Sequence, residues 1–286
     1  MIVITAASGH LGRLTLEELL SRGVPAGQIR AVARDREKLA DYAERGIEVV
    51  QGDYNDRESL VKALAGAEKF LLISSSGGDD ERLGQHLNAI AAAREAGVSH
   101  LVYTSIPQAE TNPIGFAWVH RDTEKAIRES GLPFTFLRNN WYFENSTAGL
   151  APAIEHGALI GAAGEGRVGY AARADYAAAA AVVLTGEGHQ GQVYELTGDV
   201  AITGAELAAE VSRQVGKEIG YVSLPEAEYA QALAGFGLPQ FLAEALADAD
   251  VRISEGALAA TTDTLSTLLG RPTTTVAEAV AQALRG

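Results

Sequence analysis

The sequence of 286 residues contains no cysteine, which excludes disulfides, thiolate catalysis and zinc sites built on thiolates. No apolar run approaches the roughly 20 residues that a membrane-spanning helix needs, so we expect no membrane partner. The opening residues, MIVITAASGHLG, include neither a basic leader region nor a small-residue cleavage site. We therefore expect no signal peptide and a cytoplasmic location.

Basic residues are also scarce. The sequence has 23 Lys and Arg residues against 37 Asp and Glu residues, which gives a net charge of −14. It contains no cluster of Lys and Arg. Binding to a nucleic acid needs a basic face that holds phosphates, so we expect no nucleic-acid partner. A few cations focused at one pocket remain compatible with binding a single phosphate group.

Two catalytic signatures are missing as well. No spacing of His, Asp and Glu is typical of a metal site, and no Gly-x-Ser-x-Gly elbow indicates a hydrolase. We therefore expect no metal cofactor, and the chemistry has to come from elsewhere in the chain.

Short apolar runs alternate with amphipathic stretches through the first half of the sequence. Several of the predicted helices end at a glycine, which accepts the left-handed conformation that closes a helix. The alternation predicts βαβ units and an α/β fold with a Rossmann-type, doubly wound parallel sheet. The predicted strands are residues 2–5, 29–33, 47–51, 69–74, 100–105 and 134–138, and the predicted helices are 11–22, 36–45, 57–65, 82–96 and 116–130.

The pattern loosens after Arg138. A loop and a helix are expected over residues 141–156, a strand over 193–196 and mostly helices from 224 onward. Asp175 is expected to cap an alanine-rich helix over 176–185, and Thr203 and Glu206 have the spacing of a capping box. We expect a Rossmann domain over residues 1–140. Residues 141–286 would form a smaller, mostly helical substrate-side subdomain, partly woven back into the first.

The first predicted strand runs into a glycine loop with the spacing GxxGxxG, in which the first glycine is Ala6. A tight turn here aims backbone N–H groups and a helix N-terminus at a pyrophosphate. Gly9 would admit the phosphates, and Gly12 would let the helix pack on the sheet; an ordinary tight turn is the alternative. Alanine is tolerated at position 6 with a negative φ and costly with a positive one. The predicted cofactor contacts are Ala6, Ser8, Gly9, His10, Leu11 and Gly12.

The second predicted strand ends in Arg34 and Asp35. An arginine at this place can pair with the 2′-phosphate of NADP(H), whereas an acid holds the ribose of NAD(H). Arg34 therefore favours NADP(H). A solvated surface arginine is the alternative, and Asp35 keeps NAD(H) open.

Polar residues follow the next three predicted strands, where a Rossmann fold binds its ligand. Asp53 would reach the adenine or serve only as a turn or N-cap residue. The serines would border the cofactor or form a plain loop, and hydroxyls at the end of the fifth strand would face the cofactor or be satisfied within the protein. The further predicted cofactor contacts are Ser74, Ser75, Ser76, Tyr103, Thr104, Ser105 and Lys125, of which Lys125 is otherwise an exposed helix lysine.

Motifs along nearly the whole chain resemble one family. TAASGHLG, VARD, GDYND, LLISSS, YTS, FTFLRNNWYFEN, GAAGEG and RADYAAAAA, with the late segment LGRPTTT, are similar to the type-2 NAD(P)H:quinone oxidoreductases. That group belongs to the NmrA-like atypical short-chain dehydrogenases, and triphenylmethane dye reductases are close to it. LLISSS and RNNWYFEN are more specific to the group than the glycine loop.

The resemblance implies bound NADPH and hydride transfer to a quinone or similar electrophile without a flavin. It implies pyrophosphate contacts from residues 9–12, a 2′-phosphate contact from Arg34, and Ser74 and Ser75 beside the nicotinamide ribose. Residues 139–145 would line the nicotinamide and substrate pocket.

Residue types agree with a quinone better than with an alcohol. Alcohol-oxidising short-chain dehydrogenases use a Tyr with a Lys four residues later, whereas here Arg121 precedes Lys125 by four and no Tyr is present on that helix. A quinone is electron-poor and needs little acid catalysis. We expect Trp141 and Tyr142 to stack on a flat substrate and Asn140 or Asn145 to bind its oxygen; core packing is the alternative for the aromatic residues.

Other functions remain open on the sequence. An NmrA-like redox sensor would bind a dinucleotide without catalysis, since a fold does not decide function. Reduction of a triphenylmethane dye is a second alternative, and the missing Tyr/Lys pair argues against a nucleotide-sugar epimerase. His86 and His120 could be proton shuttles or, more simply, buried structural residues. A homodimer is compatible with the sequence.

Overall fold

The computed structural model describes residues 1–285 and divides into two compact units. Unit 1 comprises Met1–Glu110, Trp118–Asn139 and Arg173–Glu195, and unit 2 comprises Thr111–Ala117, Asn140–Ala172 and Leu196–Gly286. Within the described part of the chain, no helix has both the length and the apolar character needed to cross a bilayer.

A seven-stranded sheet in the order β3-β2-β1-β4-β5-β6-β9 forms the centre of unit 1. The neighbouring pairs from β3 through to β6 run parallel, with Ile2 of β1 opposite both Ile29 and Lys69. The order reverses between β1 and β4, which defines the crevice where such sheets bind ligands. The strands are β1 Ile2–Ile4, β2 Ile29–Ala33, β3 Glu48–Gln51, β4 Lys69–Leu72, β5 His100–Ser105, β6 Phe134–Asn139 and β9 Val193–Leu196.

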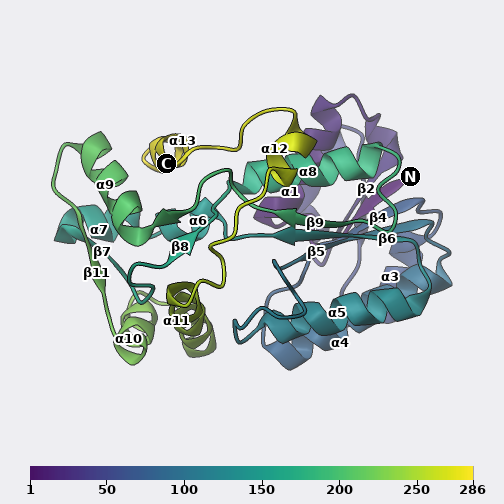
Figure 1. Ribbon diagram of the computed structural model, residues 1–286. Coiled ribbons are helices and arrows are strands. Elements are labelled where there is room, and N and C mark those ends of the chain that lie inside the picture. Colours follow the sequence, from purple (N-terminus) through teal and green to yellow (C-terminus); the bar gives the residue numbers. More distant parts are fainter. Residues whose placement is uncertain (286) are drawn as a thin grey trace. The chain divides into compact units, whose positions relative to one another are not determined.

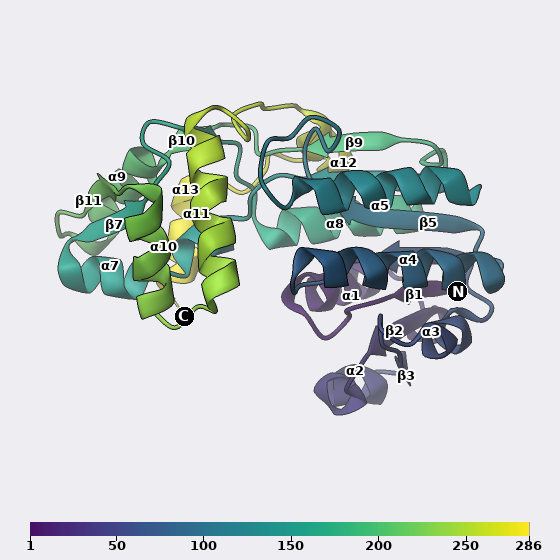
Figure 2. The same cartoon turned by 90° about the horizontal axis from the view of Figure 1, so that it is seen from below.

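Helices cover both faces of this sheet, as the doubly wound fold requires. Figures 1 and 2 show α1 and α8 on one face and α3, α4 and α5 on the other. Unit 1 contains α1 His10–Ser21, η1 Ala26–Gln28, η2 Arg36–Leu39, α2 Ala40–Glu44, α3 Arg57–Leu64, α4 Asp79–Glu95, α5 from its second residue (α5 is Ala117–Ser130) and α8 Arg173–Thr185.

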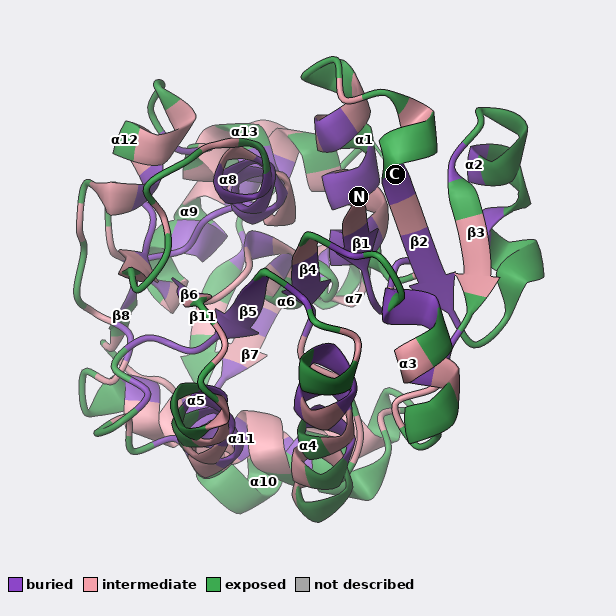
Figure 3. Cartoon of the chain, turned by 90° about the vertical axis from the view of Figure 1, so that its right-hand side faces the viewer, coloured by how far each residue is buried: buried purple, intermediate pink, exposed green. Residues whose placement is uncertain are grey.

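The central strands carry the core of unit 1. Every residue of β5 is buried, and β4 is buried after its first residue, whereas the edge strand β3 is half-buried to exposed (Figure 3). Phe70, Tyr103 and Phe136 belong to one continuous buried cluster that also takes in residues of α3 and α4. Continuous apolar strands of this kind are typical of a parallel sheet covered on both sides.

Unit 2 combines short helices with two small sheets. β11 pairs in parallel with β7, and β10 pairs antiparallel with β8. Its elements are α6 Phe143–Thr147, α7 Leu150–His156, β7 Ala158–Gly161, β8 Arg167–Val168, β10 Ile202–Thr203, α9 Gly204–Val215, β11 Gly220–Ser223, α10 Glu226–Gly235, α11 Gln240–Ser254, α12 Thr264–Leu269 and α13 Val276–Ala283.

The α/β class and the Rossmann-type order expected from the sequence are confirmed. The capping box of Thr203 and Glu206 is confirmed at the start of α9. The cap expected of Asp175 is wrong, because α8 begins at Arg173 and places Asp175 inside its first turn. The four strands of the small sheets were not expected, because two to four residues show no periodicity that can be recognised.

Candidate cofactor and substrate site

The glycine loop joins β1 to α1 at the carboxyl edge of the sheet. Gly9 is the N-cap of α1, with φ −76° and ψ 167°, and among the described residues no side chain caps this helix. The first turn also contains no acidic residue. The N–H groups and the positive end of the helix dipole are therefore available to an anion such as a pyrophosphate.

The two glycines of the loop, Gly9 and Gly12, differ in how much space a side chain would have. A Cβ on Gly12 would lie 2.6 Å from the carbonyl oxygen of Ala6 and 2.7 Å from the Cα of Ala7, so only glycine lets α1 pack this closely. A Cβ on Gly9 would meet only that same oxygen, at 3.3 Å, and its φ is negative. The fold needs Gly12, while Gly9 leaves open space for a ligand.

Ala6 adopts a left-handed conformation, with φ +51°. Its carbonyl oxygen accepts the N–H of Gly9 at 3.0 Å, which closes the turn. A left-handed conformation costs an L-residue roughly 1–2 kcal/mol. The costly case considered from the sequence is therefore the one that the structure adopts. Of the other loop residues, Ser8 is half-buried, His10 is exposed and Leu11 is buried.

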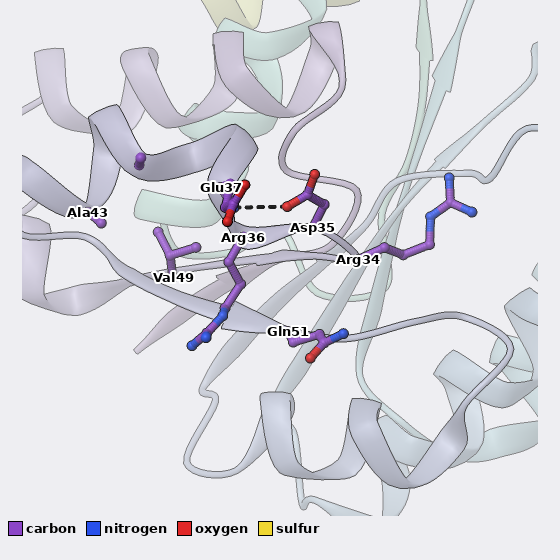
Figure 4. Close-up of a pocket in the computed structure, with 8 residues that line it drawn as sticks. Arg34, Asp35, Arg36, Glu37, Ala43, Val49 and Gln51 are labelled. Atoms are coloured by element: carbon purple, nitrogen blue, oxygen red, sulfur yellow. Dashed lines mark hydrogen bonds between the residues drawn. The ribbon is translucent and has the colours of Figure 1, made fainter.

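A cavity of about 490 Å³ opens where β2 ends, with Arg34 and Arg36 in its lining (Figure 4). The Asp35 carboxylate accepts the N–H of Glu37 at 3.0 Å and so caps η2, which gives the acid a local structural role. The two arginines extend in different directions from the strand end. No glycine-loop residue lines the cavity, so Arg34 is the part that it shares with the expected cofactor site. Arg36 was not singled out from the sequence, where only its charge beside Arg34 marks it.

Asp53 lies in the turn after β3. Its carboxylate accepts the N–H of Asn55 at 2.9 Å, and its own N–H donates to the hydroxyl of Ser59 at 3.0 Å. The N-cap of α3 is Asp56, whose carboxylate accepts the N–H of Ser59. The turn role considered for Asp53 is therefore present, and a contact with adenine stays a prediction.

Three predicted residues meet at the carboxyl ends of β4 and β5. The N–H of Ser74 donates to the Thr104 hydroxyl at 2.9 Å, and the N–H of Ser75 donates to Nε2 of His86 at 3.0 Å. Ser76 is exposed beyond them. The serine loop, residues 74–76, is thus held in place by the buried side chains of Thr104 and His86.

His86 and His120 belong to that core. Burial, followed by the positive charge of Arg82, lowers the pKa of His86 to about 3. The same two causes, in the same order and joined by His86, hold the pKa of the fully buried His120 well below its ordinary value. Both imidazoles are therefore neutral at physiological pH, which favours the structural role over the proton shuttle that the sequence also allowed.

Ser105 ends β5 and donates its hydroxyl to the Glu124 carboxylate at 2.6 Å. Glu124 also pairs with the buried Arg138 of β6, through Nε at 2.9 Å and a second nitrogen at 2.6 Å. Glu110 and Glu195 complete the set of carboxylates around Arg138, at 2.7 and 2.9 Å. Burial alone would lower the pKa of Arg138, but these three carboxylates raise it, so the cation persists.

Lys125 lies apart from the other predicted cofactor residues. Its side chain is 72% exposed and its Nζ lies 3.9 Å from Glu129, whereas the preceding residues Thr123 and Glu124 are buried. This is the exposed helix lysine that the sequence left as the alternative. A contact of Lys125 with the ribose stays a prediction that this placement does not favour.

The predicted substrate residues follow β6 and belong to unit 2. The side chain of Asn140 is buried: its Nδ2 donates to the carbonyl of Leu258 at 3.2 Å, and its Oδ1 accepts the N–H of Trp141 at 2.7 Å. The ring of Trp141 stacks on Phe116 with centroids 6.3 Å apart, and both Trp141 and Tyr142 are partly exposed. Asn145 lies exposed on α6. Trp141, Tyr142 and Asn145 thus offer accessible surface, whereas the amide of Asn140 is engaged within its own unit.

No group of three or more His, Asp or Glu that could hold a metal ion occurs within residues 1–285. The features that suit a cofactor are instead the uncapped start of α1, the open space at Gly9 and the arginines that follow β2. All three suit the phosphates of a dinucleotide.

Comparison with known proteins agrees with this geometry. Residues 6–187 match the family of NAD(P)H-binding proteins. Quinone oxidoreductase 2 of Escherichia coli K12 is 51% identical over 280 residues, covering 98% of this chain and 97% of that protein.

Two solved structures are similar over the whole chain. The NADPH complex of the E. coli NADPH-dependent quinone oxidoreductase has a TM-score of 0.95 at 50% identity, covering 99% of this chain and all of the other. The NADP(H) complex of a Citrobacter triphenylmethane reductase has a TM-score of 0.95 at 41% identity with the same coverage. The resemblance inferred from the motifs is thereby confirmed, and the chain belongs to the NAD(P)H-binding family that includes these reductases.

Proposed function

We propose that this protein is an NADPH-dependent reductase that transfers hydride to quinones or similar flat electrophiles without a flavin. The observation that carries the proposal is the 51% identity, over almost the full length of both chains, to a quinone oxidoreductase. The uncapped N-terminus of α1 and the open space at Gly9 support binding of the dinucleotide.

The bound cofactor would supply the hydride, while the protein supplies position and exclusion of water. Residues at the start of α1 would hold the pyrophosphate, and Arg34 would pair with the 2′-phosphate. Ser74 and Ser75, at the end of β4, would border the nicotinamide half, because β4 lies on the far side of β1 from β2.

Substrate choice follows from the groups available near these strand ends. The hydroxyl of Ser105 already donates to Glu124, and Lys125 is exposed. Because Arg121, and not a Tyr, precedes Lys125 by four residues, α5 lacks the Tyr/Lys pair that supplies the acid in carbonyl reduction. A quinone suits this arrangement because its reduced oxygen is phenolate-like and can take its proton from water. The partly exposed rings of Trp141 and Tyr142 would stack on such a flat substrate. Asn145, which is exposed on α6, remains a predicted contact for its oxygen, whereas the amide of Asn140 already bonds to Leu258 and Trp141.

Oxidation of NADPH followed at 340 nm with a simple benzoquinone, beside NADH, tests the proposal. We expect turnover with a clear preference for NADPH. Tight binding of NADPH without turnover of any quinone or triphenylmethane dye would instead indicate a dinucleotide sensor. Turnover of a dye but no quinone would place the activity with the triphenylmethane reductases.

Arg34→Gln tests the basis of the cofactor preference. The variant should lose roughly tenfold or more in kcat/KM for NADPH, since a charge-assisted hydrogen bond contributes about 1.5–3 kcal/mol, and should change little for NADH. Arg36→Gln is the matched control from the same strand end. A larger loss of NADPH preference in the Arg36 variant would transfer the 2′-phosphate role to that residue.

A further inference from the structure

Arg82 connects the serine loop to the core of unit 1. The side chain is only 12% exposed, and its Nε donates to the carbonyl oxygen of Ser75 at 3.0 Å. One terminal nitrogen lies 3.2 Å from both the Ser74 hydroxyl and Nε2 of His120, and the other pairs with Asp79. A single guanidinium therefore contacts the loop and the buried face of α5 together.

The proton on His120 can be placed from these contacts. A guanidinium is a donor without acceptor capacity, so Nε2 of His120 must accept from Arg82. The ring is neutral, so Nδ1 carries the proton and donates it to the Tyr103 hydroxyl, 2.9 Å away. Ser74 and Thr123 hydroxyls also lie beside the Tyr103 hydroxyl: burial raises the pKa of Tyr103, and these neighbours partly offset the rise as hydrogen-bonding partners.

The proton on His86 follows in the same way. Thr123 donates its hydroxyl to the carbonyl oxygen of Val119 at 2.7 Å, so it can only accept from Nδ1 of His86, at 2.9 Å. Nδ1 therefore carries the proton, and Nε2 presents its one lone pair to the N–H of Ser75 at 3.0 Å.

The Tyr103 hydroxyl accepts from His120 and therefore has its own proton to donate, and the Ser74 hydroxyl is one of its two partners. The Ser74 oxygen accepts from Arg82 and, in this arrangement, from Tyr103 as well. Nε2 of His86 lies 3.4 Å from it, but that lone pair already receives the Ser75 N–H at a shorter distance. The Ser74 proton is thus directed to an acceptor supplied by a ligand, at the end of β4 where the sheet order reverses.

We propose that Arg82, His120 and Tyr103 are positioning residues that fix Ser74 as a hydrogen-bond donor to an oxygen on the nicotinamide half of the bound cofactor. The proposal rests on the proposed function for the identity of the ligand. The three residues touch Ser74 or one another and act on the cofactor only through Ser74.

A double-mutant cycle on NADPH affinity tests this, with dissociation constants measured by titration of nucleotide fluorescence. Tyr103→Phe keeps the ring and removes the hydroxyl, so we expect NADPH to bind about three- to tenfold more weakly, the range of one hydrogen bond. Ser74→Ala should weaken binding similarly. Adding Tyr103→Phe to Ser74→Ala should then cost nothing more, because the route through Ser74 is already absent.

A second pair of variants covers the case in which Tyr103→Phe does not fold. Arg82→Lys retains the cation but loses the fork that reaches Ser74 and His120 together. It should weaken NADPH binding in the natural sequence and leave it unchanged in the Ser74→Ala background. Tyr194→Phe is the control, since its hydroxyl forms an equivalent hydrogen bond with His189, at 2.8 Å, and should leave the dissociation constant unchanged.

Equal losses from Tyr103→Phe with and without the Ser74 hydroxyl would overturn the proposal, because the effect would then not pass through Ser74. So would an unchanged NADPH affinity with a raised KM for quinone, which would transfer the contact to the substrate. Because the cycle reads binding of NADPH, it remains informative if no quinone is turned over, and the two proposals can fail separately.

Discussion

Ala6 illustrates how one backbone angle in the cofactor loop departs from what its residue type prefers. Its φ of +51° lies in the region that glycine enters freely and alanine does not. The turn needs this angle because the Ala6 carbonyl oxygen receives the Gly9 N–H. Strain stored in a ligand loop of this kind is a common feature of functional sites.

Replacing Ala6 by glycine should therefore stabilise the protein. We expect the free energy of unfolding to rise by about 0.5–1 kcal/mol, because relief of roughly 1–2 kcal/mol of left-handed strain exceeds the added freedom of glycine in the unfolded chain. Chemical denaturation of the ligand-free protein measures the change.

Ala7→Gly is the matched control for that change. Ala7 is fully buried and has no positive φ, so the same substitution should lower the free energy of unfolding by about 1 kcal/mol. Two changes of the same sign would show that the angle at position 6 is not the cause.

At the junction of β1 and α1, Gly9 leaves room for the ligand, whereas Gly12 is required for packing of the helix. Gly9→Ala should fold normally, because its Cβ meets one oxygen at 3.3 Å, but should weaken NADPH binding by tenfold or more through collision with the phosphates. Gly12→Ala should unfold at a markedly lower temperature, since its Cβ would overlap backbone atoms at 2.6–2.7 Å. Thermal unfolding and nucleotide titration of both variants would contradict this separation if Gly9→Ala also failed to fold.

Arg138 joins β5, α5, β6 and β9 through its carboxylate partners. Arg138→Met leaves Glu124 buried without a counter-charge, so we expect a loss of about 3–5 kcal/mol in the free energy of unfolding at pH 7. Arg45→Met is the control, because its pair with Glu17 is half-exposed on both sides and should contribute about 1 kcal/mol or less. Similar losses from both variants would contradict the assignment.

The sequence predicted the elements of unit 1 well because short apolar runs alternate there with amphipathic stretches, several of which end at a glycine. β2, β5 and β9 have the expected bounds, and α1 and α3 differ by about one residue. The sequence predicted much less of the hydrogen-bond network that holds the serine loop. Arg82, His86 and His120 come from two helices, and nothing in their spacing shows that they meet under Ser74 and Ser75. Likewise, the angle at Ala6 and the engagement of Asn140 depend on tertiary contacts.

At the scale of the whole molecule, stability as a function of pH should report on one partly buried acid of unit 2, Asp250. Burial, only partly offset by the N–H of Ala162 at 2.8 Å, raises the pKa of Asp250 to about 6. Its oxygen and the Tyr221 hydroxyl both lie against Gly161, and its charge contributes to raising the pKa of the Tyr170 and Tyr229 hydroxyls nearby. The folded pKa thus exceeds the ordinary value of 3.8, so ionisation of Asp250 opposes folding as the pH rises from about 4 to about 6.

Asp250→Asn should therefore stabilise the protein at pH 7.5, by up to about 3 kcal/mol, with the advantage disappearing near pH 4. The measurement is the difference in unfolding free energy between variant and natural sequence across that range. Asp248→Asn, at a partly buried position two residues earlier in α11, is the control. It should destabilise, because Asp248 accepts the N–H of Gly115 and pairs with Arg252. An advantage of Asp250→Asn that persisted unchanged at pH 4 would contradict the role of ionisation.

The path of the chain between the two units has an evolutionary consequence. Each departure from unit 1, after residues 110, 139 and 195, follows the carboxyl end of a strand: β5, β6 and β9. Unit 2 is therefore built from three separate segments, two of which are inserted between parts of unit 1, and not from one continuous stretch of chain. Recombination could not exchange it as a single cassette, because a cut after Asn139 would also remove α8 and β9. New specificities in this lineage would instead arise by lengthening or rewriting loops in place.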